Sequence, residues 1–101
     1  MAFNINRRVK EGILIRGNDV TIGVIVAKIE KFTRGKQAEL TIKGVEGLET
    51  AYLGLDYNSL ILRDGISIAQ RHVSQGKRQR ANMYPLHCEI DKEYTIEPIH
   101  R

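Results

Sequence analysis

Residues 16–29 read RGNDVTIGVIVAKI, a polar turn followed by a long run of β-branched and aliphatic side chains. Gly17, Asn18 and Asp19 tolerate the left-handed backbone angles of a tight hairpin. From Val20 to Ile29, apolar side chains occupy both alternating faces, which is typical of a central strand. This stretch predicts a hairpin that leads into the middle of a β-sheet.

Further strand-like runs lie on both sides of this stretch and are separated by turn-forming residues. They are Phe3 to Ile5, Ile13 to Ile15, Ala38 to Ile42, Ala51 to Leu55, Leu60 to Leu62, and an edge strand around Tyr94 to Ile96. The connections near Lys10 to Gly12 and Thr33 to Lys36 are expected to be turns. The spacing of these runs predicts a mainly β chain with antiparallel pairing.

One short helix is expected from about Gly65 to Ser74. Asp64 can cap its first amide groups, and Ile66, Ala69 and Val73 are spaced for one helical face. The predicted fold is therefore a small antiparallel β-sheet or barrel-like domain with one short helix. A chain of 101 residues buries a modest core, so pairing with a second copy as a homo-oligomer is one way to complete that core, although composition alone does not decide it.

The charge of the chain favours a polyanionic partner. The formal net charge is +4, and no Asp or Glu occurs between Asp64 and Glu89. That interval contains four basic residues that are candidates for accessory phosphate contacts, Arg71, Lys77, Arg78 and Arg80. A solvated segment without a ligand is the alternative interpretation of the same run.

The composition argues against several other classes. Cys88 is the sole cysteine, so neither an intramolecular disulfide nor a cysteine cage for a metal is available, and a cytoplasmic location is expected. No apolar run approaches the roughly 20 residues of a membrane helix, and no signal peptide is recognisable. His72, His87 and His100 are isolated, and neither a phosphate loop nor a hydrolase signature is present. We therefore expect no metal, no cofactor and no enzyme activity.

The run NRRVKEGILIRGNDVT at residues 6–21 resembles the amino-terminal signature of the CsrA/RsmA (carbon storage regulator) family. That family has Thr-Arg-Arg after a short strand, a turn ending in Glu, an apolar triplet and then Gly-Asp-Asp. Here Asn6 replaces the threonine, Lys10 replaces a glycine and Arg16 is inserted. Residues 53–56 and 60–64 resemble the family's fourth and fifth strands, although Gln37 to Lys43 is an alternative fourth strand.

The resemblance implies an RNA-binding regulator of translation that recognises GGA sequences in the single-stranded loops of mRNA hairpins. Members of the family form domain-swapped homodimers in which the first strand of one chain lies beside the fifth strand of the other. By position, one chain would supply Ile5, Asn6, Arg7 and Arg8, and the other would supply Ile61, Leu62 and Arg63. Residues 1–76 would form the family-like domain with an insertion around 30–49. Residues 77–101 would be a basic linker and a carboxyl-terminal extension.

Two other classes compete with this interpretation. A small phage-type interaction module that inhibits a host protein would have a similar length and a basic surface, and would have a protein as its partner. A structural subunit of a larger assembly would form high-order oligomers without RNA. Recovery of RNA with the purified protein would distinguish the RNA-binding regulator from the inhibitory module and from the structural subunit.

Overall fold

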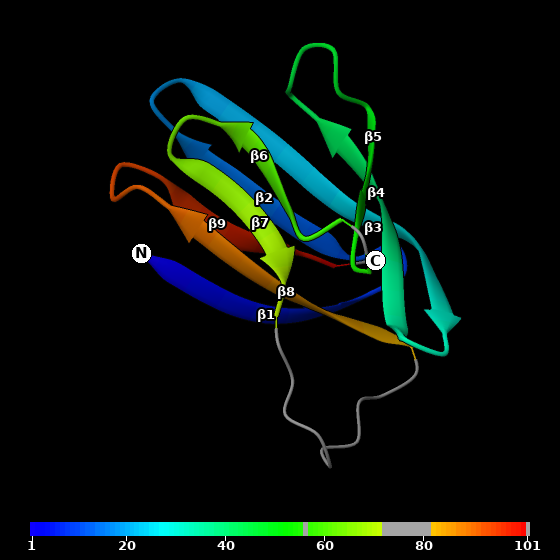
Figure 1. Ribbon diagram of the computed structural model, residues 1–101. Helices are drawn as coiled ribbons and strands as arrows, with labels where there is room; N and C mark the ends of the chain where they lie inside the picture. The colour runs from blue at the N-terminus through cyan, green and yellow to red at the C-terminus, as the bar shows by residue number, and fades with distance from the viewer. Residues whose placement is uncertain (56, 72–81, 101) are drawn as a thin grey trace.

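The structure is a computed structural model that describes residues 1–55, 57–71 and 82–100. Its strands are β1 (Ala2–Arg8), β2 (Gly12–Gly17), β3 (Val20–Phe32), β4 (Gly35–Lys43), β5 (Thr50–Leu53), β6 (Ser59–Arg63), β7 (Ile66–Gln70), β8 (Met83–Ile90) and β9 (Thr95–Ile99). Sheet A has the order β1-β8-β7-β6, and sheet B has the order β5-β4-β3-β2-β9. The pairs within both sheets are antiparallel, and Figure 1 shows the two sheets as two layers. The expectation of a mainly β, antiparallel fold is confirmed.

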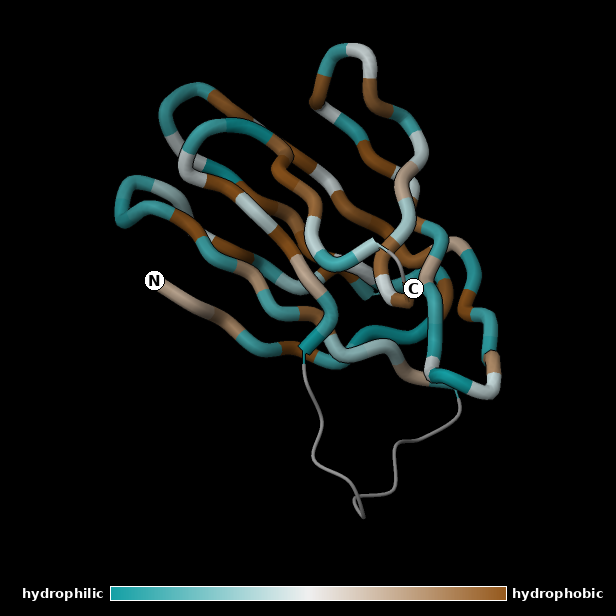
Figure 2. The backbone as a smooth tube through the Cα atoms, in the orientation of Figure 1, coloured by the Kyte–Doolittle hydropathy of each residue, from teal (hydrophilic) through white to brown (hydrophobic). Residues whose placement is uncertain are grey.

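One hydrophobic core lies between the sheets, because alternate residues of each strand point inward. Sheet B buries the apolar positions of β3 and β4, including Val24 and Leu40. Sheet A faces them with Ile66, Ile68 and Leu86, each at most 1% exposed. Figure 2 shows the resulting alternation of hydrophobic and hydrophilic residues along the strands.

The hairpin predicted from residues 16–29 is present. Asn18 and Asp19 both have left-handed φ angles, of 48° and 58°, and join β2 to β3. β3 lies between β2 and β4, which confirms that it is a central strand. The turn expected near Lys10 is also present, since Lys10 has a φ of 75°. It carries the chain from β1 in sheet A to β2 in sheet B.

The helix expected from Gly65 to Ser74 is wrong within the described residues, where no helix occurs and Ile66–Gln70 forms β7. Asp64 and Gly65 are the turn of a hairpin between β6 and β7, and Gly65 has a φ of 82°. Ile66 and Ile68 are both buried, which is the two-residue period of a strand. Residues 72–74 lie outside the described part of the chain.

β8 is a central strand of sheet A that the sequence analysis did not assign, and it contains Pro85. In an antiparallel ladder, the N–H and C=O groups of one residue point to the same neighbouring strand. The Pro85 carbonyl accepts a hydrogen bond from the Arg71 N–H at 3.0 Å. The missing N–H of Pro85 therefore faces the point where β7 ends, so the proline removes no bond between β8 and β1.

The segments expected to be an insertion and an extension both contribute strands to the sheets. Residues 30–49 include β4, which supplies buried Ala38, Leu40 and Ile42 to the core. The carboxyl-terminal residues form β8, which pairs with β1, and β9, which pairs with β2. The first and last strands of the chain therefore each pair with a strand from the opposite end of the sequence.

In the described part of the chain, no helix has the length and apolar character needed to cross a membrane.

Candidate nucleic-acid interface

The outer face of sheet A, which is turned away from sheet B, carries a group of polar side chains. Along β8, Leu86 and Cys88 point into the core, so His87 between them points outward. The register between β1 and β8 places Asn4 opposite His87 and Asn6 opposite Pro85. Arg71 follows β7 on the other side of β8. We call Asn4, Asn6, Arg71 and His87 the polar face.

Hydrogen bonds join these four side chains into two pairs across the strands. The Arg71 guanidinium donates from Nη2 to Oδ1 of Asn6 at 2.8 Å. Nδ1 of His87 lies 2.7 Å from Oδ1 of Asn4, and its Nε2 lies 3.4 Å from Oε1 of Glu89. Asn4 and Asn6 are exposed, while His87 and Arg71 are half-buried. These bonds fix planar side chains side by side on an accessible sheet.

Two further arginines follow Asn6 along β1. Arg7 donates from Nε to the Asn6 carbonyl at 2.8 Å and from Nη1 to the Ile99 carbonyl at 3.4 Å. The backbone N–H of Arg8 donates to Oε1 of Glu11 at 2.9 Å. Both arginines are half-buried and lie at the edge of sheet A. Arg8 alternates with Asn6 on the outer face and adds positive charge beside the polar face, whereas Arg7 faces the other side of β1, toward β9 of sheet B.

Lys36 of β4 extends this positive charge to the beginning of β8. Its Nζ donates to the Met83 carbonyl at 3.1 Å. Partial burial lowers the pKa of Lys36, and repulsion from Lys31, its register partner, lowers it further. Lys36, Arg8 and Arg71 thus place three cationic side chains near the end of sheet A at which β1 finishes and β8 begins.

The structure brings together part of the set predicted from the sequence. Ile5, Asn6, Arg7 and Arg8 lie on β1, and Arg71, predicted as an accessory contact, binds Asn6 directly. Ile61, Leu62 and Arg63 lie on β6, which is the opposite edge of sheet A, with β8 and β7 between. Lys77, Arg78 and Arg80 lie outside the described residues.

The three β6 residues differ in their accessibility. Ile61 is 73% exposed and Arg63 is exposed, but the Leu62 side chain is 4% exposed and packs in the core. A ligand can therefore reach Ile61 and Arg63, whereas the Leu62 side chain is occupied by packing. Within one chain, these residues do not meet the β1 group.

Two members of the polar face were missed by the sequence analysis. Asn4 alternates with Phe3 and Ile5, a pattern that marks it as the outward residue of the first strand. His87 lies in β8, which was left unassigned because Pro85 argues against a central strand. The alternation of Leu86, Cys88 and Ile90 was the available signal for this strand.

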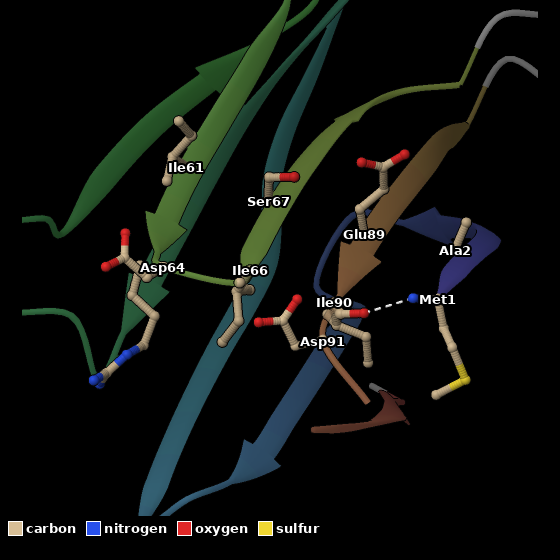
Figure 3. A pocket seen from close by; sticks show the side chains of 11 residues that line it. Met1, Ala2, Ile61, Asp64, Ile66, Ser67, Glu89, Ile90 and Asp91 are labelled. Carbon is tan, nitrogen blue, oxygen red and sulfur yellow. Dashed lines mark hydrogen bonds between the residues drawn. The ribbon is translucent and has the colours of Figure 1, made fainter. Parts of the chain in front are cut away.

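A hollow of about 570 Å³ lies at the other end of sheet A, near the turn between β6 and β7. Figure 3 shows the side chains of Asp64, Glu89 and Asp91 around it, and the amino group of Met1 donating to the Ile90 carbonyl at 2.7 Å. Arg63 and the amino group of Met1 also line the hollow, so its lining carries charges of both signs. Among the described residues, no group of three or more His, Cys, Asp or Glu side chains is placed to hold a metal ion.

Two of the described side chains that could act as a nucleophile or a base, Cys88 and His87, are buried or engaged. Burial raises the pKa of the Cys88 thiol to about 12, which keeps it protonated at neutral pH. His87 has its two nitrogens directed at Asn4 and Glu89, and the structure gives it no hydrogen bond to Ser67 on the neighbouring strand.

Comparisons of the chain with protein-family models, with curated proteins and with solved structures find no match.

Proposed function

We propose that this protein binds single-stranded RNA on the outer face of sheet A and regulates translation. The observation that carries the proposal is the pairing of Asn6 with Arg71 beside that of Asn4 with His87. Amide, guanidinium and imidazole groups on an open sheet offer hydrogen bonds and stacking surfaces to unstacked bases. Arg7 and Arg8 at the edge of the sheet supply contacts to the phosphates.

The resemblance of residues 6–21 to the carbon storage regulator family supports the more specific part of the proposal. On this basis the ligand is a GGA-type loop in an mRNA leader or a small RNA, and the protein acts in the cytoplasm as a homodimer. A second copy would bring its Ile61 and Arg63 toward the β1 residues of the first. Both β1 and β6 are edge strands, and an unpaired edge is available for contact with another chain.

The binding experiment measures fluorescence anisotropy of a labelled hairpin with GGA in its loop and of a control hairpin with a scrambled loop. The wild-type protein is expected to prefer the GGA hairpin. Replacing Arg71 by Ala removes a planar donor next to Asn6, so affinity is expected to fall by about 1–3 kcal/mol. RNA recovered with the purified protein is sequenced in parallel to identify natural ligands.

Arg63→Ala is the matched variant, because it removes the same charge from the opposite edge of sheet A. A loss of affinity in both variants supports a site completed by β6 of a second chain. A loss in Arg71→Ala alone restricts the site to one chain. Equal binding of both hairpins by the wild type contradicts GGA recognition, and co-purification of a protein without RNA favours an inhibitory interaction module.

The homodimer is tested separately by light scattering. The chain has a mass of 11.5 kDa, so the dimer is expected at about twice that value. A monomer mass at every working concentration would rule the dimer out and leave the polar face of a single chain as the binding site.

A further inference from the structure

Donors on neighbouring strands orient the side-chain amides of Asn4 and Asn6. Arginine has no acceptor, so the atom of Asn6 that faces Arg71 is its carbonyl oxygen. Oδ1 of Asn4 faces Nδ1 of His87 at 2.7 Å and accepts from it when Nδ1 carries the proton, as in the imidazolium form that also donates from Nε2 to Glu89. Protonation of the ring retains this donor, because both nitrogens of the imidazolium carry a proton. The two amides therefore share one orientation, with oxygen engaged by the protein.

The amino group of each amide points to the other side of its side chain. Among the described residues, no hydrogen bond involves Nδ2 of Asn4 or Nδ2 of Asn6, and both side chains are exposed. Each Nδ2 carries two N–H donors. The outer face of sheet A consequently offers a ligand two amino groups that can donate, while the amide oxygens are already used.

The spacing of the two amides matches successive bases of an unstacked strand. Asn4 and Asn6 are two residues apart on the same face of β1, a separation of about 6.8 Å. This is about twice the roughly 3.4 Å rise per nucleotide in a stacked duplex strand. Consecutive bases of single-stranded RNA are often splayed apart in this way when a protein reads their edges.

We propose that Asn4 and Asn6 select two consecutive keto bases, guanine or uracil, an inference that rests on the proposed binding of single-stranded RNA. An amino donor is satisfied by an acceptor, and the keto oxygens that distinguish these bases are O6 of guanine and O4 of uracil, since N7 is an acceptor in both purines. Adenine and cytosine present exocyclic amino groups, which are donors, at the corresponding positions. Asn4 and Asn6 are thus specificity residues that His87 and Arg71 orient, and Arg8 at the end of β1 attracts the phosphate chain without regard to the base.

The test compares two labelled RNA octamers of equal length and charge, alternating GU and alternating AC, by fluorescence anisotropy. Every base of the first carries a keto group, and every base of the second carries an amino group. The wild-type protein is expected to bind the GU octamer about tenfold more tightly. Asn4→Asp and Asn6→Asp each replace an amino group by an oxygen of nearly the same shape, and each is expected to reduce that preference to about twofold.

Asn18→Asp is the matched control, because it adds the same negative charge in the turn between β2 and β3, away from the polar face. It is expected to leave the ratio of the two affinities unchanged. Thermal melting checks that the variants are folded. The two substitutions on β1, Asn4→Asp and Asn6→Asp, each test the keto preference independently. Equal affinity for both octamers, or an unchanged ratio in both β1 variants, overturns the keto preference while leaving RNA binding intact. Failure of the wild type to bind either octamer instead overturns the proposed function itself.

Discussion

Tyr84 is the largest of the fully buried side chains, and its hydroxyl has no hydrogen-bond partner in the described structure. A buried polar group without a partner loses its hydration and gains nothing in return. The same burial raises the pKa of the Tyr84 phenol far above its usual value. At this position, the ring contributes to packing while its hydroxyl opposes folding.

We expect Tyr84→Phe to raise the free energy of unfolding by about 1 kcal/mol, because it removes the unpaired hydroxyl and keeps the ring. Urea denaturation measures the change. Tyr52→Phe is the control, since it removes an exposed hydroxyl that donates to Glu39 at 3.3 Å, and a change within about 0.5 kcal/mol is expected there. A loss of stability in Tyr84→Phe would show that the hydroxyl is bonded.

Alkaline pH is expected to destabilise the protein through Cys88 and Tyr84. Burial raises the pKa of both groups in the folded state, whereas in the unfolded chain they ionise near 9 and 10. Their contribution to stability is therefore complete below about pH 9 and is lost as the pH rises toward 12. Between pH 8 and pH 10.5 the expected loss is about 3 kcal/mol, measured by urea denaturation at both values.

The double variant Cys88→Ala and Tyr84→Phe isolates these two groups. Its free energy of unfolding is expected to change much less between the same two pH values, whatever its absolute stability. A variant that follows the wild-type pH dependence would assign the alkaline loss to other groups.

At the scale of elements, the sequence analysis differs most from the structure at two places. At each of them, the local sequence is compatible with two kinds of secondary structure. Asp64-Gly65 fits both a helix start and a hairpin turn, and the burial of Ile66 and Ile68 against sheet B decides for the hairpin. Pro85 argues against a central strand, yet it is accommodated because β7 ends beside it. Both decisions depend on neighbours that are distant in the sequence.

In the candidate site, too, some residues can be identified from the local sequence, whereas their partners are set by strands that are distant in the sequence. Asn6, Arg7 and Arg8 follow a short apolar run and were identified from local order alone. The partnership of Asn6 with Arg71 spans 65 positions, and that of Asn4 with His87 spans 83. Such pairs are created by the strand order of sheet A, which the local pattern of residues does not specify.

The connection between β4 and β5 contains two glycines with similar φ angles, and only one of them lies against another backbone segment. Comparing them distinguishes the cost of backbone strain from the cost of steric overlap. Gly44 has a φ of 91°, and a Cβ there would overlap the backbone carbonyl oxygen of Thr21. Gly47 has a similar φ of 79°, but a Cβ there would meet no atom within 4 Å. Both substitutions are therefore strained in φ, and the overlap occurs at Gly44.

We expect Gly47→Ala to cost about 1 kcal/mol, from the left-handed φ alone. Gly44→Ala is expected to cost at least about 2 kcal/mol more, because a backbone atom of β3 must move. Thermal unfolding of the two variants measures the difference. Equal losses would mean that the end of β4 moves away from β3 at little cost.

At the scale of the whole molecule, the net charge of +4 is unevenly placed. Arg7, Arg8 and Arg71 lie at one end of sheet A, and Asp64 and Asp91 line the hollow at the other. The first end attracts a phosphate chain, whereas at the second end the carboxylates lie beside the cationic groups of Arg63 and Met1 and offset them. The charge distribution of sheet A thereby restricts the orientation of a bound RNA strand independently of its base sequence.

We expect RNA affinity to fall steeply with salt, and replacement of Lys77, Arg78 and Arg80 by Gln to flatten the dependence. Loss of three contacts to a single strand lowers the slope of log K against log salt concentration by up to about 2. Replacing Arg16, Lys28 and Lys43 on the outer face of sheet B by Gln removes the same charge and is expected to change the slope less. Anisotropy titrations at several salt concentrations measure both slopes, and identical slopes would exclude the residue 77–80 segment from phosphate contact.

The pairing of β1 with β8 has a consequence for the newborn chain on the ribosome. β1 is synthesised first, but its partner begins at Met83 and is made among the last residues. At about 5–20 residues per second, the β1 segment waits roughly 4 to 15 s for that strand. During this interval its Phe3 and Ile5 have no sheet A to join, so the β1 segment is exposed to chaperones and to aggregation until β8 has been made.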